Sequence, residues 1–154
     1  MKNIHAVVLA AGLSRRMNSR RTNKVCLELL GKPVIVRTLE ALTECGIKSH
    51  TAVVGGTSAA EVMRLLSGRF DNISYAYQLR QLGPADALAC AVKALPETVD
   101  DNTLLLTVPG HRIVTPGIIE KLLEFYNQNP VKLAGLQLFD KNGVLKQPLS
   151  IYLG

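Results

Sequence analysis

The sequence contains no tryptophan, only 5% aromatic residues and three cysteines in 154 residues. Surfaces that bind nucleic acid commonly pair spread basic residues with aromatic side chains, so the scarcity of aromatics argues against that class. The cysteines, Cys26, Cys45 and Cys90, are odd in number and widely spaced. They form neither a disulfide framework nor a metal motif, and the expected location is the reducing cytoplasm. No apolar run approaches the roughly 18 to 20 residues of a membrane-spanning helix, so no membrane partner is expected.

Acidic residues are missing from the first 24 positions, which contain six lysines and arginines. The other 130 residues contain twelve residues of each sign, so the formal net charge of +6 comes from this one segment. A positive charge gathered in one place fits a small polyphosphate better than it fits the long backbone of a nucleic acid.

The composition, 47% hydrophobic and 19% charged, is typical of a globular chain, and the length predicts a single domain over residues 1–154. Apolar runs alternate with segments of helical periodicity, which predicts βα units and a mostly parallel sheet with helices on both faces, a three-layer α/β/α fold. The expected strands cover residues 4–9, 50–54, 73–78, 103–108, 131–139 and 144–152, and the expected helices cover residues 34–45 and begin near residues 58, 84 and 116.

Ser58 and Glu61 have the spacing of a capping box at the start of the second helix. In open α/β sheets, ligands bind beyond the carboxyl ends of the strands. The loops at that edge are expected at residues 10–24, 55–57, 78–84 and 108–115, and a basic, glycine-containing loop after the first strand indicates an anion site there.

Two sequence blocks resemble one known family. Residues 9–17 read LAAGLSRRM and are followed by Asn23-Lys24 and by Gly31-Lys32-Pro33. This block resembles the signature of the Rossmann-like nucleotidyltransferases, which include the sugar-1-phosphate nucleotidyltransferases and the enzymes that add GMP or CMP to molybdopterin. A second block at residues 78–88 resembles the sugar branch, in which a glutamine and a Gly-Thr pair read the base. The resemblance implies a Rossmann-like fold.

The resemblance also implies roles for the residues of the first block. Arg16 would contact the β- and γ-phosphates of a nucleoside triphosphate, and Lys24 would hold the α-phosphate and stabilise its charge during attack. Positioning and charge neutralisation of this kind account for most of the catalysis in such reactions. Ala10, Ala11 and Gly12 would let the backbone approach the nucleotide closely, and Ser14 and Arg15 are the other residues of the loop expected to bind it.

In the second block, the resemblance implies that Gln78 would hydrogen-bond an edge of the base and that Gly83 would let the base lie against the backbone. The implied reaction is nucleotidyl transfer, in which the phosphate of a sugar or cofactor acceptor attacks the α-phosphorus of the NTP and pyrophosphate leaves. The implied partners are the NTP and a phosphorylated small molecule. The sequence leaves open the base, the acceptor and the oligomeric state.

Three departures from the family pattern concern the metal and the acceptor. The family's fourth strand ends in Gly-Asp, whose carboxylate binds Mg²⁺, whereas Gly110 stands where we align that Asp, so no metal ligand is assigned. Pro84 replaces the threonine of the second block, and the family continues past residue 154, where residues that contact the acceptor lie. Two alternatives to an active transferase stay open: a nucleotide-binding or regulatory module with impaired catalysis, and the N-terminal part of a longer transferase.

Overall fold

The computed structural model describes residues 3–12, 23–129, 134–139 and 145–153. Its strands, apart from one short hairpin, are β1 Ile4–Leu9, β4 Ser49–Val54, β5 Ile73–Tyr77, β6 Leu104–Pro109, β7 Ala134–Phe139 and β8 Leu145–Leu153. Its α-helices are α1 Val34–Glu44, α2 Ala59–Ser67, α3 Pro84–Lys93 and α4 Pro116–Gln128. The expected bounds of β1 are confirmed, and the other bounds inside the described ranges agree with expectation or differ from it by one residue. Among the helices of these ranges, none has the length and apolar character needed to cross a bilayer.

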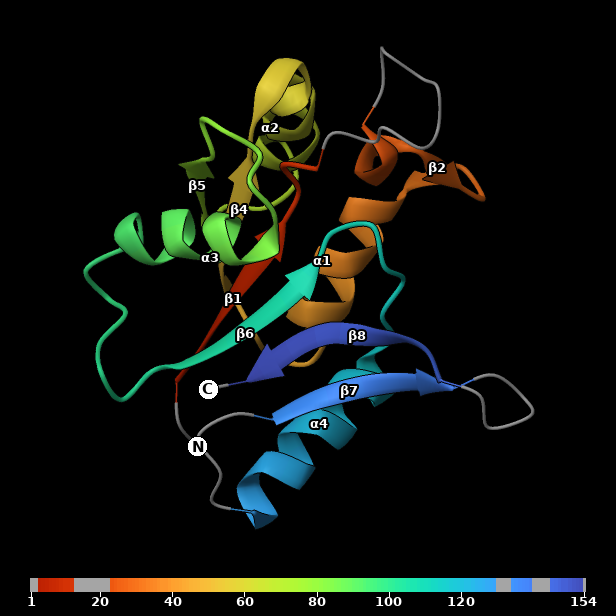
Figure 1. Cartoon of the computed structure of the whole chain (residues 1–154), viewed down its shortest axis with the longest axis vertical. Coiled ribbons are helices and arrows are strands. Elements are labelled where there is room, and N and C mark those ends of the chain that lie inside the picture. The colour runs from red at the N-terminus through yellow and green to blue at the C-terminus, as the bar shows by residue number, and fades with distance from the viewer. Residues whose placement is uncertain (1–2, 13–22, 130–133, 140–144, 154) are drawn as a thin grey trace.

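The strands form one sheet in the order β5-β4-β1-β6-β8-β7 (Figure 1). β5, β4, β1 and β6 are parallel neighbours, and β8 runs antiparallel to both β6 and β7. The expected α/β fold with a mostly parallel sheet is therefore confirmed, and its last two strands form an antiparallel pair. All four parallel strands end at the same edge of the sheet, because parallel neighbours share their direction.

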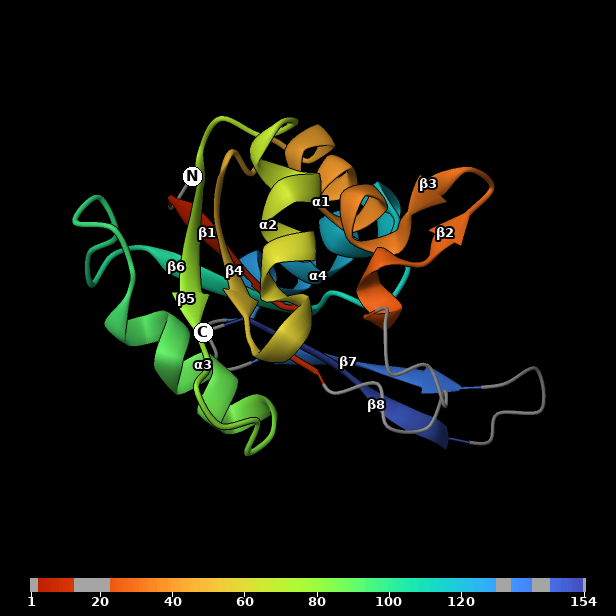
Figure 2. The same cartoon turned by 90° about the horizontal axis from the view of Figure 1, so that it is seen from above.

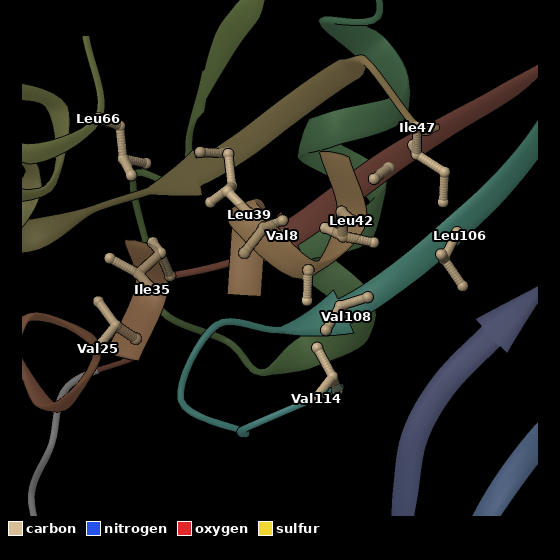
Figure 3. Packing of buried hydrophobic residues seen from close by; sticks show 14 of the residues in the cluster. Val8, Val25, Ile35, Leu39, Leu42, Ile47, Leu66, Leu106, Val108 and Val114 are labelled. Carbon is tan, nitrogen blue, oxygen red and sulfur yellow. The ribbon is translucent and has the colours of Figure 1, made fainter. Parts of the chain in front are cut away.

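Alternation along β1 builds the two buried layers. Ala6 and Val8 belong to the larger hydrophobic cluster, which also contains side chains of α1, α2 and α4 (Figure 3). Val7, between them, belongs to a second cluster with Ala87 and Ala91 of α3. Successive strand residues point to opposite faces, so α3 covers one face of the sheet and the other helices cover the second (Figure 2).

The helices begin and end where the sequence indicates. The inward positions of α1 follow helical spacing, with Ile35, Leu39 and Leu42 fully buried. Gly46 follows with a φ of 81°, a left-handed conformation that glycine adopts without strain. Pro84 and Pro116 occupy the first positions of α3 and α4, where no backbone N–H is needed.

The capping box expected at Ser58 and Glu61 is wrong. Ser58 is the N-cap of α2, but its side chain makes no capping bond. Its Oγ instead accepts a hydrogen bond of 3.0 Å from Asn23, and the Glu61 carboxylate binds the thiol of Cys26. Both side chains are therefore used in tertiary contacts with the segment before α1, and those contacts replace the local cap.

Short elements that the periodicity does not reveal lie in the segment before α1 and directly after β4. They are the 3-10 helix η2 Lys24–Cys26, the two-residue strands β2 Glu28–Leu29 and β3 Lys32–Pro33, and, after β4, the 3-10 helix η3 Gly56–Ser58. Leu30 and Gly31 turn between β2 and β3 with φ angles of 51° and 73°. The Lys32 ammonium binds the Glu40 carboxylate of α1 at 2.7 Å, so this lysine of the Gly-Lys-Pro motif has a structural partner.

Candidate functional site at the carboxyl ends of the strands

Three of the strand-end loops meet at Gly55, directly after β4. A Cβ atom on this glycine would lie 2.7 Å from the Gln78 carbonyl oxygen and 3.2 Å from the Ala11 Cβ. Its φ of −176° is ordinary extended backbone, so the lack of space, and not the conformation, requires a glycine. The loops after β1, β4 and β5 are therefore packed against one another, and the Gly-Gly pair that closes β4 is the sequence signal for this contact.

Asn23 fixes the start of η2 to the end of β1. Its buried side chain donates from Nδ2 to the Ala10 carbonyl at 2.8 Å and to Ser58 Oγ at 3.0 Å. Its Oδ1 accepts a bond of 3.2 Å from the Val25 N–H. One amide thus joins β1, η2 and the start of α2. The sequence reading includes Asn23 in a motif but assigns no role to its side chain.

Lys24 is held between this anchor and the core. Val25 is 1% exposed and belongs to the larger hydrophobic cluster (Figure 3). Burial, followed by the negative charge of Glu61, raises the pKa of the Cys26 thiol to about 12, so it is an unreactive structural group. The Lys24 side chain runs over the end of β1, with its Cε 3.8 Å from the position of a Cβ on Gly12. The backbone of Lys24 is therefore held by its neighbours Asn23 and Val25, while its side chain is partly exposed.

Gly110, directly after β6, lies in close contact with β1 and η2. Its N–H donates to the Leu9 carbonyl at 2.9 Å, and a Cβ there would lie 3.1 Å from that same oxygen and 3.4 Å from Val25 Cγ1. An aspartate at this position would have to displace these neighbours. The first side chain after β6 with free space in front of it is that of His111, which is exposed.

His111 and Arg112 bring further basic groups to the same edge. The Arg112 carbonyl accepts a bond of 3.1 Å from Thr38, a fully buried residue of α1, which fixes the loop. Desolvation by neighbouring atoms, followed by the positive charges of Lys24 and Arg112, lowers the pKa of His111 to about 4. The imidazole is therefore neutral at pH 7.

The expected base-reading residues lie together at the β5–α3 loop. Gln78 is 2% exposed, and its Nε2 donates to the Gly83 carbonyl at 3.2 Å and to the Asp86 carboxylate at 2.7 Å. These two bonds use both amide N–H groups, so its amide oxygen is the side-chain group left for a ligand. Gly83 has a φ of 112°, which requires a glycine.

Not all of the expected site residues can be placed. The described residues bring Ala10, Ala11, Gly12 and Lys24 to the end of β1, and Gln78 and Gly83 to the neighbouring loop. Ser14, Arg15 and Arg16 lie outside the described residues, and their roles stay predictions.

The residues at this edge do not fit the Mg²⁺ ion that the family resemblance implies. Mg²⁺ prefers oxygen ligands, above all carboxylates. The first 24 residues contain no acid, and the first acid after β6 is Glu120. In the described ranges, no group of three or more His, Cys, Asp or Glu side chains could hold a metal. The donors at the strand ends are Lys24, His111 and Arg112, two cations and an imidazole.

A cavity of about 450 Å³ lies at the opposite edge, where the parallel strands begin, and is lined by residues that include Asn3, His5, Lys48 and Ser49. His5 there is 1% exposed, and its ring nitrogens hydrogen-bond Ser49 and Thr51 at 2.8 Å each. Ligands of open parallel sheets bind at the carboxyl ends, and the loops named by the sequence meet at that end. We therefore place the candidate site there and not in the cavity.

Comparisons with known proteins point to the family that the two sequence blocks resemble. The family described as "MobA-like NTP transferase domain" matches residues 6–152. The chain is 35% identical over 145 residues to "Bifunctional protein GlmU" of Thermoanaerobacter pseudethanolicus, covering 93% of this chain and 30% of that protein. It is 36% identical over 124 residues to the protein of the same name from Heliobacterium modesticaldum, covering 80% of this chain and 26% of that protein.

A solved structure agrees with the fold. The crystal structure of 4-diphosphocytidyl-2C-methyl-D-erythritol synthase from Anaerococcus prevotii matches with a TM-score of 0.67 at 19% sequence identity, over 99% of this chain and 69% of that one. At this identity, the likeness concerns the fold alone. The chain spans less than a third of the two curated relatives, so what those whole proteins do does not follow for it from similarity.

Proposed function

The chain belongs to the MobA-like NTP transferase family, and from that premise we propose that it binds a nucleoside triphosphate and transfers its nucleotidyl group to a phosphorylated small molecule. The observation that carries the proposal is the meeting of the loops after β1, β4 and β5, with Lys24 fixed beside them by Asn23. These loops bring glycine-containing backbone and a cation to one place, which suits the phosphates of a nucleotide.

In the proposed reaction, an oxygen of the acceptor phosphate forms a bond to the α-phosphorus of the NTP. The bond from that phosphorus to the oxygen that bridges it to the β-phosphate breaks, and pyrophosphate leaves with the electron pair. Lys24 neutralises the growing charge on the α-phosphate, and Arg16 is proposed to hold the β- and γ-phosphates. The chemical work of the protein is thus to align the acceptor phosphate with the triphosphate and to offset their charge.

The base is proposed to bind beside the β5–α3 loop. The amide N–H groups of Gln78 are bound to Gly83 and Asp86, so Gln78 presents an acceptor to the base. An acceptor in this position favours a base edge that carries an amino or imino hydrogen. Gly83 keeps the loop backbone open at the start of α3, where a side chain would be strained by the φ of 112°.

Pyrophosphate exchange tests the proposal. The protein is incubated with each of the common NTPs and labelled pyrophosphate, with Mg²⁺ and with a chelator, and the label entering the NTP is counted. We expect exchange with at least one NTP, and Lys24→Ala should lower it by about two orders of magnitude, as for loss of one charged transition-state contact. Lys48→Ala, an exposed lysine at the opposite edge of the sheet, is the matched control and should exchange normally.

A second candidate function is nucleotide binding without turnover, either as a regulatory module or as the N-terminal part of a longer transferase. The absence of acids from the first 24 residues favours it. Tight NTP binding with no exchange in any metal would support this candidate over the transferase.

A further inference from the structure

β5 (Ile73–Tyr77) forms one edge of the sheet, and β4 is its only neighbour among the described strands. Figure 2 shows β5 in front of the other strands, with α2 on one side of it and α3 on the other. α3 packs across β1, β4 and β5, and α2 packs against β4 and β5, so both helices also cover strands further in. Within the described ranges, no strand pairs with the outer side of β5.

The backbone groups of alternate residues point outward from this edge. The carbonyl of Asn72 and the N–H of Gln78 both bond to β4, at 3.2 Å and 2.8 Å, so the even-numbered residues face β4. Both backbone groups of a residue lie on the same side of a strand, and the side alternates along it. The N–H and C=O groups of Ile73, Tyr75 and Tyr77 therefore point away from the sheet. The part of the chain that the structure describes forms no hydrogen bond with these groups.

The side chains along this edge are suited to burial. β5 contains no charged residue and no proline, and its register with β4 has no bulge, so it lacks the features that commonly protect an edge strand from pairing. By alternation Ile73, Tyr75 and Tyr77 lie on one face, where the first two pack partly against the larger hydrophobic cluster. Tyr77 is 56% exposed, and in the loop after it Leu79 and Leu82 are 80% and 73% exposed.

We propose that a second copy of the chain binds at this edge, with the two β5 strands antiparallel about a twofold axis at Tyr75. In this register the Tyr75 residues of the two copies face each other, and Ile73 of each copy faces Tyr77 of the other. Each outward N–H then meets an outward carbonyl, as in the hydrogen-bonded pairs of an antiparallel ladder. The aromatic side chains meet on the face that α2 covers. The two six-stranded sheets become one continuous sheet through an isologous contact.

The nearest charges on either side of β5 favour the antiparallel arrangement. Asp71 lies two residues before the strand, and Arg80 lies three residues after it. Antiparallel pairing brings the acidic end of one strand beside the basic end of the other, whereas parallel pairing would bring like charges together. A second copy therefore matches this edge in backbone groups, side chains and charge. Such a dimer requires none of the nucleotide chemistry proposed above.

Sedimentation velocity of the intact chain over a range of concentrations tests the proposal. We expect a reversible dimer, and Tyr77→Lys should raise its dissociation constant about tenfold or more, because the twofold axis places two lysines against the Ile73 side chains. Phe125→Lys is the matched control and should leave the dimer unchanged. Phe125 is 53% exposed on α4, which packs against β7 at the opposite edge of the sheet. Thermal unfolding followed by circular dichroism shows that each variant is folded at the temperature of the experiment.

A charge exchange tests the orientation of the two strands. Asp71→Arg and Arg80→Asp should each raise the dissociation constant severalfold, and the double variant should recover most of the wild-type affinity, with larger effects at low ionic strength. Failure of the double variant to recover would overturn the antiparallel register.

Two results would overturn the dimer itself. One is a wild-type chain that stays monomeric up to the highest soluble concentration. The other is a dimer that folded Tyr77→Lys leaves intact, because its contact would then lie on another surface.

Discussion

Replacing Asn23 should reveal how the site is held together. Asn23→Ala removes three hydrogen bonds: two donated by Nδ2, to the Ala10 carbonyl and Ser58 Oγ, and one accepted by Oδ1 from the Val25 N–H. Ala10 and Val25 are each 1% exposed, so their backbone groups would have little access to water as a replacement partner. A lost intramolecular bond costs about 1 kcal/mol, and a buried group left unpaired costs about 1–3 kcal/mol.

The free energy of unfolding of Asn23→Ala should therefore fall by about 3 kcal/mol. For a chain of this length, that corresponds to a drop of roughly 10 °C in the unfolding midpoint. Ser58→Ala loses only the bond from Asn23 and should cost about 1 kcal/mol. Asn23→Asp keeps an acceptor for the Val25 N–H but faces the Ala10 carbonyl with an oxygen, so it should destabilise at least as much as the alanine variant.

The assay is urea unfolding followed by circular dichroism, paired with NTP binding at a temperature where each variant is folded. Because Asn23 fixes the residue before Lys24, we expect the folded Asn23→Ala protein to bind NTP several-fold more weakly. A stability within 1 kcal/mol of the wild type would refute the hydrogen-bond reasoning. Normal affinity in a destabilised variant would refute the positioning of Lys24 by Asn23.

Two further predictions concern the core and the loop packing. Burial lowers the pKa of His5 from 6.5 to about 4, so between these pH values the unfolded chain binds the additional proton and stability falls as the pH falls, by about 3 kcal/mol at pH 4. Urea unfolding at several pH values should show that His5→Gln loses less stability over this window than the wild type, and equal slopes would contradict the prediction. Gly55→Ala places a Cβ 2.7 Å from the Gln78 carbonyl oxygen and should cost about 2 kcal/mol and weaken NTP binding. Gly117→Ala, in α4 with nothing within 4 Å of the new Cβ, should instead be neutral or stabilising by about 0.5–1 kcal/mol.

Much of the fold can be predicted from the sequence, because the spacing of apolar residues along the chain determines which faces of the strands and helices are buried. The run that forms β1 is apolar on both sides, as expected for a central strand covered by helices on both faces, and its bounds are predicted correctly. The capping box fails for a tertiary reason: Ser58 and Glu61 have the right spacing, but they bind Asn23 and Cys26 instead. Local spacing contains no information about a competing partner 35 residues away.

The candidate site likewise has features that the sequence predicts and features that it does not. Motif spacing places Lys24, Gln78 and Gly83 at the carboxyl edge of the sheet, because the ends of parallel strands lie together. It does not show that the amide N–H groups of Gln78 are already bound, nor that Gly110 is confined by the Leu9 carbonyl. These facts depend on side-chain direction and on contacts between distant segments, which a single sequence does not encode in a readable pattern.

The most direct test of the site is a ¹⁵N–¹H correlation NMR titration of the protein with a non-hydrolysable analogue of the NTP that binds most tightly. We predict that the amide signals of Ala11, Gly12, Lys24 and Gly110 shift together and saturate at one dissociation constant. A titration that instead shifts the signals around His5, at the cavity of about 450 Å³ where the parallel strands begin, would contradict the placement of the nucleotide at the carboxyl ends of the strands.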